Sequence, residues 1–308
     1  MAIISKHFSH AKENNRKVMS GAARARAPGA FLRLNHGLTH YELDDDATRP
    51  LLICIHGWST ASYVWDPLKP LLRAQGYRVL SYDLYGRGFS DRPKVAQTAK
   101  LFTHQLTELL DRLSLNTQPL NVVGYSMGGA IAARFVSERM HQVERLLLIA
   151  PAGMAVRAPG LRAFAQRYPR LTDPHILALL PPVLRRQFQN ASKGFKDDPT
   201  VQLIANKQMR ELSYRGYLPS LLSSLKGVLA TRMQAEHEAI TRSPVAVRAI
   251  FASEDTTIPH PQAKALFDQW TAGADQVSHI MTGAGHALAY THAQQILQSV
   301  RDFLSEAP

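Results

Sequence analysis

The sequence predicts an α/β protein: a doubly wound, mostly parallel sheet with helices on both faces and an inserted helical segment. Two observations predict this class. Short apolar runs alternate with helical stretches in the first and last parts of the chain, as a parallel sheet with crossover helices requires. Between those parts, a proline-rich stretch interrupts the alternation. The 308 residues suffice for one such domain with an insertion.

The predicted elements fall into three regions after a basic N-terminal extension, residues 1–30. The first core region, residues 31–151, has predicted strands at 51–55, 78–82, 120–124 and 145–150, and predicted helices at 67–75, 99–113 and 127–139. The second core region, residues 244–308, continues with strands at 245–252 and 277–281 and helices at 261–271 and 292–304. Both regions would therefore contribute to one sheet.

Residues 152–243 are expected to form a helical insertion that caps the core. Its prolines divide it into short predicted helices, and they stand at positions 159, 169, 174, 181, 182, 199 and 219. Apolar residues recur at helical spacing over residues 219–229. We interpret that stripe as a packing face, with a substrate-facing surface as the alternative.

The composition is that of a globular protein, with 45% hydrophobic and 19% charged residues. Cys54 is the only cysteine, so no disulfide can form within the chain. Because it lies within an apolar strand, we expect an inert core thiol and not a nucleophile. No apolar run reaches the roughly 18 residues of a membrane span, and the N-terminus lacks the apolar stretch of a secretory signal. We therefore expect a soluble, cytoplasmic protein, with a transit peptide as the alternative.

The net charge of +12 is unevenly distributed. Residues 1–30 carry six Lys or Arg against one Glu, and residues 152–243 carry fourteen against six Asp or Glu. No helix-turn-helix, zinc-finger or RNA-binding motif accompanies this charge, so we expect no nucleic-acid partner. A solvated basic face is the simplest interpretation. Peripheral contact with an anionic membrane surface, or attraction of an acidic substrate, is the alternative.

The most specific motif is Gly-Tyr-Ser-Met-Gly at residues 124–128. An apolar run precedes it and a helix-forming series follows it, which is the setting of a nucleophile elbow. In such an elbow a strand turns sharply into a helix, so that the hydroxyl of Ser126 projects from the sheet edge. The glycines on either side relieve the crowding of this turn. The motif predicts that Ser126 is a nucleophile.

Two further motifs follow predicted strands: His-Gly-Trp-Ser at residues 56–59 and Asp-Leu-Tyr-Gly-Arg-Gly-Phe-Ser at residues 83–90. Together with the serine motif, in this order, they resemble the α/β-hydrolase superfamily over about residues 48–304. The resemblance implies an oxyanion hole formed by the backbone N–H groups of Trp58 and Met127. It also implies that His56 braces its loop and that residues 83–90 form a structural loop. The expected pocket side chains are Trp58, Tyr63, Tyr125 and Met127.

A serine nucleophile needs a base and a carboxylate that orients the base. Among thirteen histidines, His286 is selected because it follows a predicted strand in a glycine-flanked loop near the C-terminus, where the family places its base. Two acidic residues follow the strand at residues 245–252, and the family pattern favours Asp255 over Glu254. The chain order Ser126, Asp255, His286 is the one expected for this fold.

The predicted activity is hydrolysis of a small-molecule carboxylic ester with a lipophilic, medium-length acyl group, without a cofactor. His36 and His40 are spaced like helix-borne metal ligands, but no further ligand completes a set, so no metal is expected. The same triad leaves open a carbon–carbon bond hydrolase, a perhydrolase or an acyltransferase. Carbon–carbon bond hydrolases usually have asparagine where Tyr125 stands. A non-catalytic ligand receptor of the same fold is the alternative from another functional class. The oligomeric state is not predicted.

Overall fold

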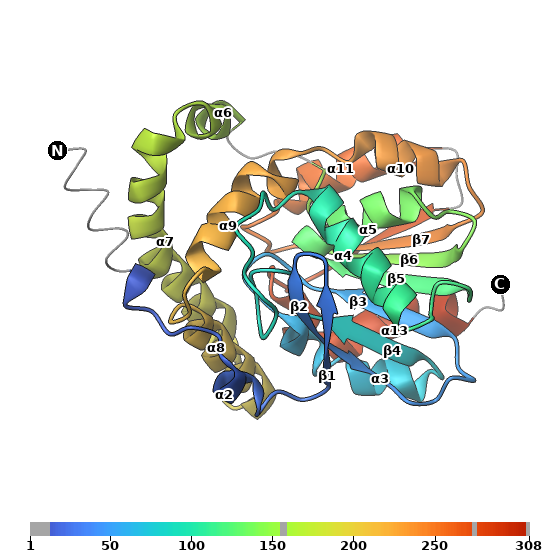
Figure 1. Ribbon diagram of the computed structural model, residues 1–308. Helices are drawn as coiled ribbons and strands as arrows, with labels where there is room; N and C mark the ends of the chain where they lie inside the picture. Colours follow the sequence, from blue (N-terminus) through green and yellow to red (C-terminus); the bar gives the residue numbers. More distant parts are fainter. Residues whose placement is uncertain (1–12, 155–158, 273–275, 306–308) are drawn as a thin grey trace.

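The computed structural model describes residues 13–154, 159–272 and 276–305, and its centre is an eight-stranded sheet (Figure 1). The strands are β1 (Ala30–Leu34), β2 (Gly37–Leu43), β3 (Leu51–Ile55), β4 (Arg78–Tyr82), β5 (Leu120–Tyr125), β6 (Val143–Ile149), β7 (Ala246–Ala252) and β8 (Gln276–Met281). Their order across the sheet is β1-β2-β4-β3-β5-β6-β7-β8. The pairs β1–β2 and β2–β4 are antiparallel, and all pairs from β4 to β8 are parallel. The predicted fold class is confirmed.

The hairpin of β1 and β2 at one edge was not among the predicted strands. The six predicted strands all form, with bounds within two residues of those expected. Five of them, β3 to β7, are mostly buried and rich in apolar residues, whereas β8 is a half-buried edge strand. The hairpin alternates apolar residues with Arg, Thr and His. A search for continuous apolar runs therefore finds the central strands and misses the edge pair.

Helices cover both faces of the sheet (Figure 1). On one face lie α4 (Ala99–Arg112), α5 (Met127–Ser137), α10 (Gln234–Thr241) and α11 (His260–Trp270), and on the other lie α3 (Lys69–Ala74), α12 (Leu288–Thr291) and α13 (Ala293–Ser305). Along β3, Ile53 joins the first hydrophobic core, while Leu52 and Cys54 join the second. This alternation shows that the central strands are buried on both sides.

The insertion lies between β6 and β7. Its helices are α6 (Pro159–Arg167), α7 (Pro169–Ser192), α8 (Pro199–Glu211), α9 (Tyr217–Lys226) and α10. The predicted division into short helices is wrong for α7, which runs for 24 residues through Pro174, Pro181 and Pro182. The carbonyls deprived of donors belong to residues 170, 177 and 178, which are exposed or half-buried, so water can satisfy them. The buried side of α7 packs against α9 and keeps the helix intact.

The outer surface of α6 and α7 exposes apolar side chains to solvent. Leu179 is 64% exposed and Leu171 is 58% exposed, and Phe164 and Tyr168 are also exposed. Within the ranges that the structure describes, no helix combines the length and the apolarity needed to cross a bilayer. These side chains are therefore a feature of the outer surface of the insertion.

The described part of the N-terminal extension touches both the insertion and the core. Lys17 pairs with Tyr214, just before α9, and its backbone N–H donates to Ser213. The short helix α2 (Gly21–Arg24) ends at Arg24, whose guanidinium donates to the carbonyl of Phe89. The extension thus connects the start of α9 with the loop that follows β4.

Candidate active site

Ser126 occupies a strained turn between β5 and α5, with φ 54° and ψ −119°. The positions two residues before and two residues after Ser126 have space only for glycine. A Cβ on Gly124 would lie 2.6 Å from the carbonyl oxygen of Gly128, and a Cβ on Gly128 would overlap the carbonyl of Ile55. The Ser126 N–H donates to the Ile149 carbonyl at 3.0 Å, which holds the turn against β6. The surroundings therefore sustain a backbone conformation that costs an isolated serine about 1–3 kcal/mol.

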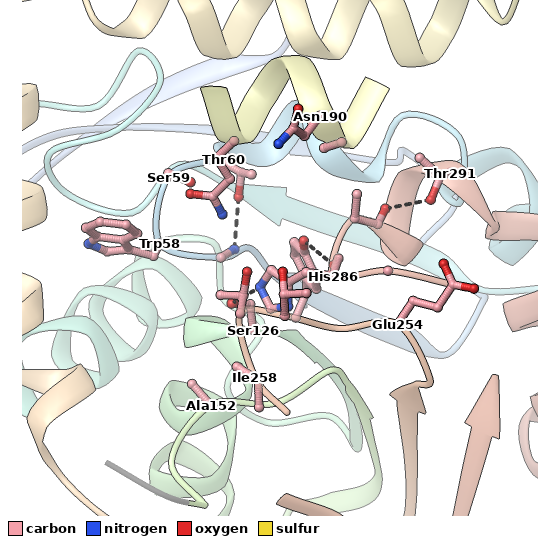
Figure 2. A pocket seen from close by; sticks show the side chains of 18 of the residues that line it. Trp58, Ser59, Thr60, Ser126, Ala152, Asn190, Glu254, Ile258, His286 and Thr291 are labelled. Carbon is pink, nitrogen blue, oxygen red and sulfur yellow. Dashed lines mark hydrogen bonds between the residues drawn. The ribbon is translucent and has the colours of Figure 1, made fainter. Parts of the chain in front are cut away.

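The structure brings the three predicted triad side chains together. Figure 2 shows two of them, Ser126 and His286, side by side at the cavity. The Ser126 Oγ lies 2.9 Å from His286 Nε2, and His286 Nδ1 lies 2.7 Å from Asp255 Oδ2. The other carboxylate oxygen, Asp255 Oδ1, accepts from the backbone N–H groups of Thr257 and Ile258, each at 2.8 Å. The carboxylate is almost fully buried, and its two oxygens have separate, fixed partners.

These contacts define how the imidazole can act. A carboxylate can only accept, so the hydrogen bond between Nδ1 and Asp255 requires a proton on Nδ1. In the neutral form of His286, the lone pair of Nε2 therefore faces the Ser126 hydroxyl. Tyr125 supports the loop by donating from its hydroxyl to the His286 carbonyl at 2.8 Å. The imidazole is thus placed to accept the serine proton.

Glu254, the alternative carboxylate, has a different position. It is exposed and lies at the wall of the cavity, and Figure 2 shows its carboxylate directed away from His286. Its backbone N–H donates to Ala284, which ties the loop after β7 to the loop that carries the histidine. The geometry favours Asp255 as the partner of the imidazole.

The two predicted oxyanion donors lie beside the serine. Among the described residues, neither the Trp58 amide nor the Met127 amide has an acceptor. The Gly57 carbonyl, which shares a peptide plane with the Trp58 N–H, receives a hydrogen bond from His56 Nδ1 at 2.9 Å. The Leu84 N–H donates to His56 Nε2, and burial lowers the pKa of His56 to about 4. His56 is therefore neutral and braces the loop.

A cavity of about 810 Å³ opens above Ser126, between the core and the insertion. Trp58 and Tyr125 line it, as expected. Tyr63 and Met127 do not: both are packed in the hydrophobic cores beneath the site, Met127 because it begins α5 and faces the sheet. From the insertion, Asn190 faces the site (Figure 2). The sequence offered no signal for this residue, because no motif surrounds it.

Cys54 and His40, the possible nucleophile and the possible metal ligand in the sequence, both occupy structural positions. Cys54 is fully buried, and burial raises the pKa of its thiol, which disfavours the reactive thiolate. His40 lies on β2 and not on a helix; its Nδ1 is 2.8 Å from Asp83 and its Nε2 contacts the Pro28 carbonyl. No cluster of three potential metal ligands occurs in the described ranges.

Known proteins share this sequence pattern and this fold. A 2-hydroxymuconate semialdehyde hydrolase of Pseudomonas sp. (strain CF600) is 28% identical over 277 residues, which cover 86% of this chain and 89% of that protein. The crystal structure of a bromoperoxidase from Bacillus anthracis superposes with a TM-score of 0.72 and 20% identity, covering 90% of this chain and 99% of the other. An esterase from Exiguobacterium antarcticum also gives 0.72, with 16% identity and 90% and 100% coverage.

The family assignment rests on the match to a sequence model and not on these individual likenesses. The model described as "Alpha/beta hydrolase family" matches residues 52–298, which include all but the first residue of β3, the serine turn, the whole insertion and the His286 loop. That span includes every residue whose geometry is described above for the serine, the histidine and the carboxylate. The chain belongs to the alpha/beta hydrolase family.

Proposed function

We propose that the protein hydrolyses carboxylic esters through an acyl-enzyme on Ser126, with His286 as general base and Asp255 as the group that orients it. The supporting observation is the unbroken hydrogen-bond chain from Ser126 Oγ through the imidazole to the buried carboxylate. A hydroxyl alone is a poor nucleophile, and an imidazole whose Nε2 lies 2.9 Å away and whose Nδ1 is held by a carboxylate removes that limitation.

The reaction proceeds in two halves. Ser126 Oγ attacks the ester carbonyl carbon while His286 Nε2 accepts the hydroxyl proton, and the electron pair of the C=O bond moves to oxygen. The N–H groups of Trp58 and Met127 stabilise that oxyanion. When the intermediate collapses, the C–O bond breaks, and His286 protonates the leaving alcohol. Water then attacks the acyl-enzyme in the same way and releases the acid.

The substrate class follows from the wall of the cavity. The insertion contributes the apolar side chains of Val183, Phe188, Leu225 and Leu229. The apolar part of this wall can remove the nonpolar surface of a ligand from water, which favours a lipophilic acyl group of medium length. The insertion also contributes polar side chains to the lining, including Arg186, Gln187 and Asn190, which could contact the polar parts of an ester. This combination supports an esterase with a lipophilic substrate.

The test is labelling with a fluorophosphonate probe, followed by mass spectrometry of the modified peptide. We expect the label on Ser126, and we expect it to disappear in Ser126→Ala. Nitrophenyl esters from acetate to laurate should then show the highest kcat/KM at an intermediate chain length. A wild-type protein that takes no label, or that hydrolyses none of these esters, contradicts the proposal.

A carbon–carbon bond hydrolase is a second candidate, favoured by the similarity to 2-hydroxymuconate semialdehyde hydrolase. Both activities would use the same serine, so labelling cannot separate them. The discriminating measurement compares kcat/KM for the esters with that for a conjugated dicarbonyl ring-fission product. A preference of more than about 100-fold for the dicarbonyl, or about 2.7 kcal/mol in transition-state stabilisation, would replace the ester proposal.

A further inference from the structure

Helix α9 of the insertion touches the loop that would supply the oxyanion hole. The Tyr217 hydroxyl, which is fully buried, donates to the carbonyl of Ser59 at 3.0 Å. In the opposite direction, the indole Nε1 of Trp58 donates to the carbonyl of Leu221 at 3.0 Å. The backbone of this loop, at Ser59, and the side chain of Trp58 are therefore both hydrogen-bonded to α9.

A third connection runs through Arg87, whose guanidinium is completely buried. Its Nε donates to the Trp58 carbonyl at 3.0 Å, and its Nη2 donates to the Ser224 hydroxyl of α9 at 2.6 Å. Its Nη1 donates to the Tyr85 carbonyl and to Gln97 Oε1. Burial lowers the pKa of Arg87 to about 10, so the group stays a cation at neutral pH. The Trp58 carbonyl thus faces a charged donor held between the core and α9.

These contacts act on three successive peptide planes. The carbonyl of Gly57 is held by His56, that of Trp58 by Arg87 and that of Ser59 by Tyr217. The first of these planes also carries the Trp58 N–H. A hydrogen-bond donor stabilises a developing oxyanion most when its direction is fixed before the reaction, because no reorganisation is then needed. A loop free to rotate about the Trp58 backbone would lose part of that advantage.

We propose that α9 is a positioning element of the active site, and that Tyr217 and Ser224 are positioning residues that hold the Trp58 amide in its reactive direction, the latter through Arg87. This inference rests on the proposed ester hydrolysis. The same helix lines the cavity through Leu225. The shape of the insertion and the strength of the oxyanion hole are therefore linked by one helix.

The start of α9 is itself held in place. The backbone N–H of Arg215 donates to the Lys17 carbonyl at 2.8 Å, and Ser213 accepts from the Lys17 N–H at 2.9 Å. These bonds connect the N-terminal extension to the residues that immediately precede the helix. The position of α9 is fixed at this end by contacts that do not involve the cavity.

The test uses two substitutions that remove one hydroxyl each, Tyr217→Phe and Ser224→Ala. The chain supplies a matched control for each. Tyr77→Phe removes another buried hydroxyl, which donates to the Leu304 carbonyl far from the site. Ser220→Ala removes a serine hydroxyl one turn earlier on α9, whose one bond among the described residues is to the carbonyl of Gly216, the residue that caps this helix. The controls report the cost of losing a hydroxyl without loosening the oxyanion loop.

We expect kcat for a nitrophenyl ester to fall about 10-fold in each test variant, with KM changed by less than about twofold, since deleting an oxyanion donor outright costs about 10²–10³-fold. Both control variants should stay within about twofold of wild type. A trifluoromethyl ketone, which forms an oxyanion with the serine, should bind less tightly by the same factor as the loss in kcat/KM. A role in packing alone would not produce this parallel.

Two results overturn the inference. In the first, the wild type is active and takes the label, but the two test variants have the same kcat as their controls. The other is a rise in KM with kcat unchanged, which would mean that α9 only shapes the cavity. A wild type that neither takes the fluorophosphonate label nor hydrolyses esters overturns the proposed function and this inference together, so the two failures are distinguishable.

Discussion

Replacing Asp255 by asparagine tests how the imidazole is oriented. The Asp255 Oδ1 position accepts two backbone N–H groups, from Thr257 and Ile258, so the amide oxygen of asparagine must occupy it. The amide NH₂ then faces His286 Nδ1 and donates to it. This reverses the tautomer: the proton moves to Nε2, which donates to Ser126 Oγ and can no longer accept the hydroxyl proton.

The expected loss is about 10⁴-fold in kcat, or about 5 kcal/mol in the activation free energy. The side chain changes little in size and keeps its backbone hydrogen bonds, so the thermal midpoint should stay within a few degrees. The assay is steady-state hydrolysis of a nitrophenyl ester at neutral pH, with calorimetry of the same samples. Glu254→Gln is the matched control, because it neutralises the adjacent exposed carboxylate, and we expect it to retain wild-type activity.

Two outcomes would refute this reasoning. If Asp255→Asn retained kcat within about 10-fold of wild type, the carboxylate would not determine the tautomer. If Glu254→Gln instead caused the large loss, the orienting role would belong to Glu254, despite its exposure and its direction away from the imidazole.

Other substitutions test the fold and the outer surface of the insertion. Burial lowers the pKa of His237 from 6.5 to about 4, so its contribution to stability is complete above pH 6.5 and is lost as the pH falls toward 4. Measured by urea unfolding, the free energy of unfolding of the wild type should fall between pH 7.5 and pH 5 by about 2 kcal/mol more than that of His237→Phe. An identical pH dependence of the two proteins would contradict this. Gly128→Ala places a methyl group against a carbonyl of β3 and should lower the Tm by at least about 5 °C, whereas Gly160→Ala, which meets no atom within 4 Å, should not. If the exposed apolar side chains of α7, together with the basic residues of the insertion, bind anionic lipid, sedimentation with anionic vesicles should fall severalfold in a Leu171→Ser, Leu179→Ser variant. Equal sedimentation of the wild type with neutral vesicles would exclude the electrostatic part of that binding.

The sequence could predict the central strands and the residues that meet at the site because their requirements are local. A serine in a strained turn needs glycines at fixed offsets, and parallel strands buried on both faces must be apolar throughout. The carboxyl ends of β5, β7 and β8 lie at one edge of the sheet, so the residues that follow them meet in space. Ser126, Asp255 and His286 each follow one of these strands.

The elements that the sequence did not predict depend on surroundings that a single sequence does not show. Prolines ordinarily end helices, and α7 continues through three of them because its freed carbonyls are at the surface and its inner side is packed. Met127 stands within the serine motif and Tyr63 shortly follows the motif at residues 56–59, yet the backbone turns both side chains into the cores. Position in a motif specifies where the backbone lies better than where the side chain points.

Arg87 illustrates a limit of another kind. The motif at residues 83–90 predicts a structural loop, and the contacts of Arg87 with Tyr85 and Gln97 agree with that interpretation. Its contact with Ser224, 137 residues later, has no counterpart in any local pattern. If α9 positions the oxyanion loop, a change in the insertion can alter the chemical step without touching the substrate. Relatives with the same serine, histidine and carboxylate could then differ in rate as well as in substrate, because the insertion that selects the acyl group also holds the groups that stabilise the transition state.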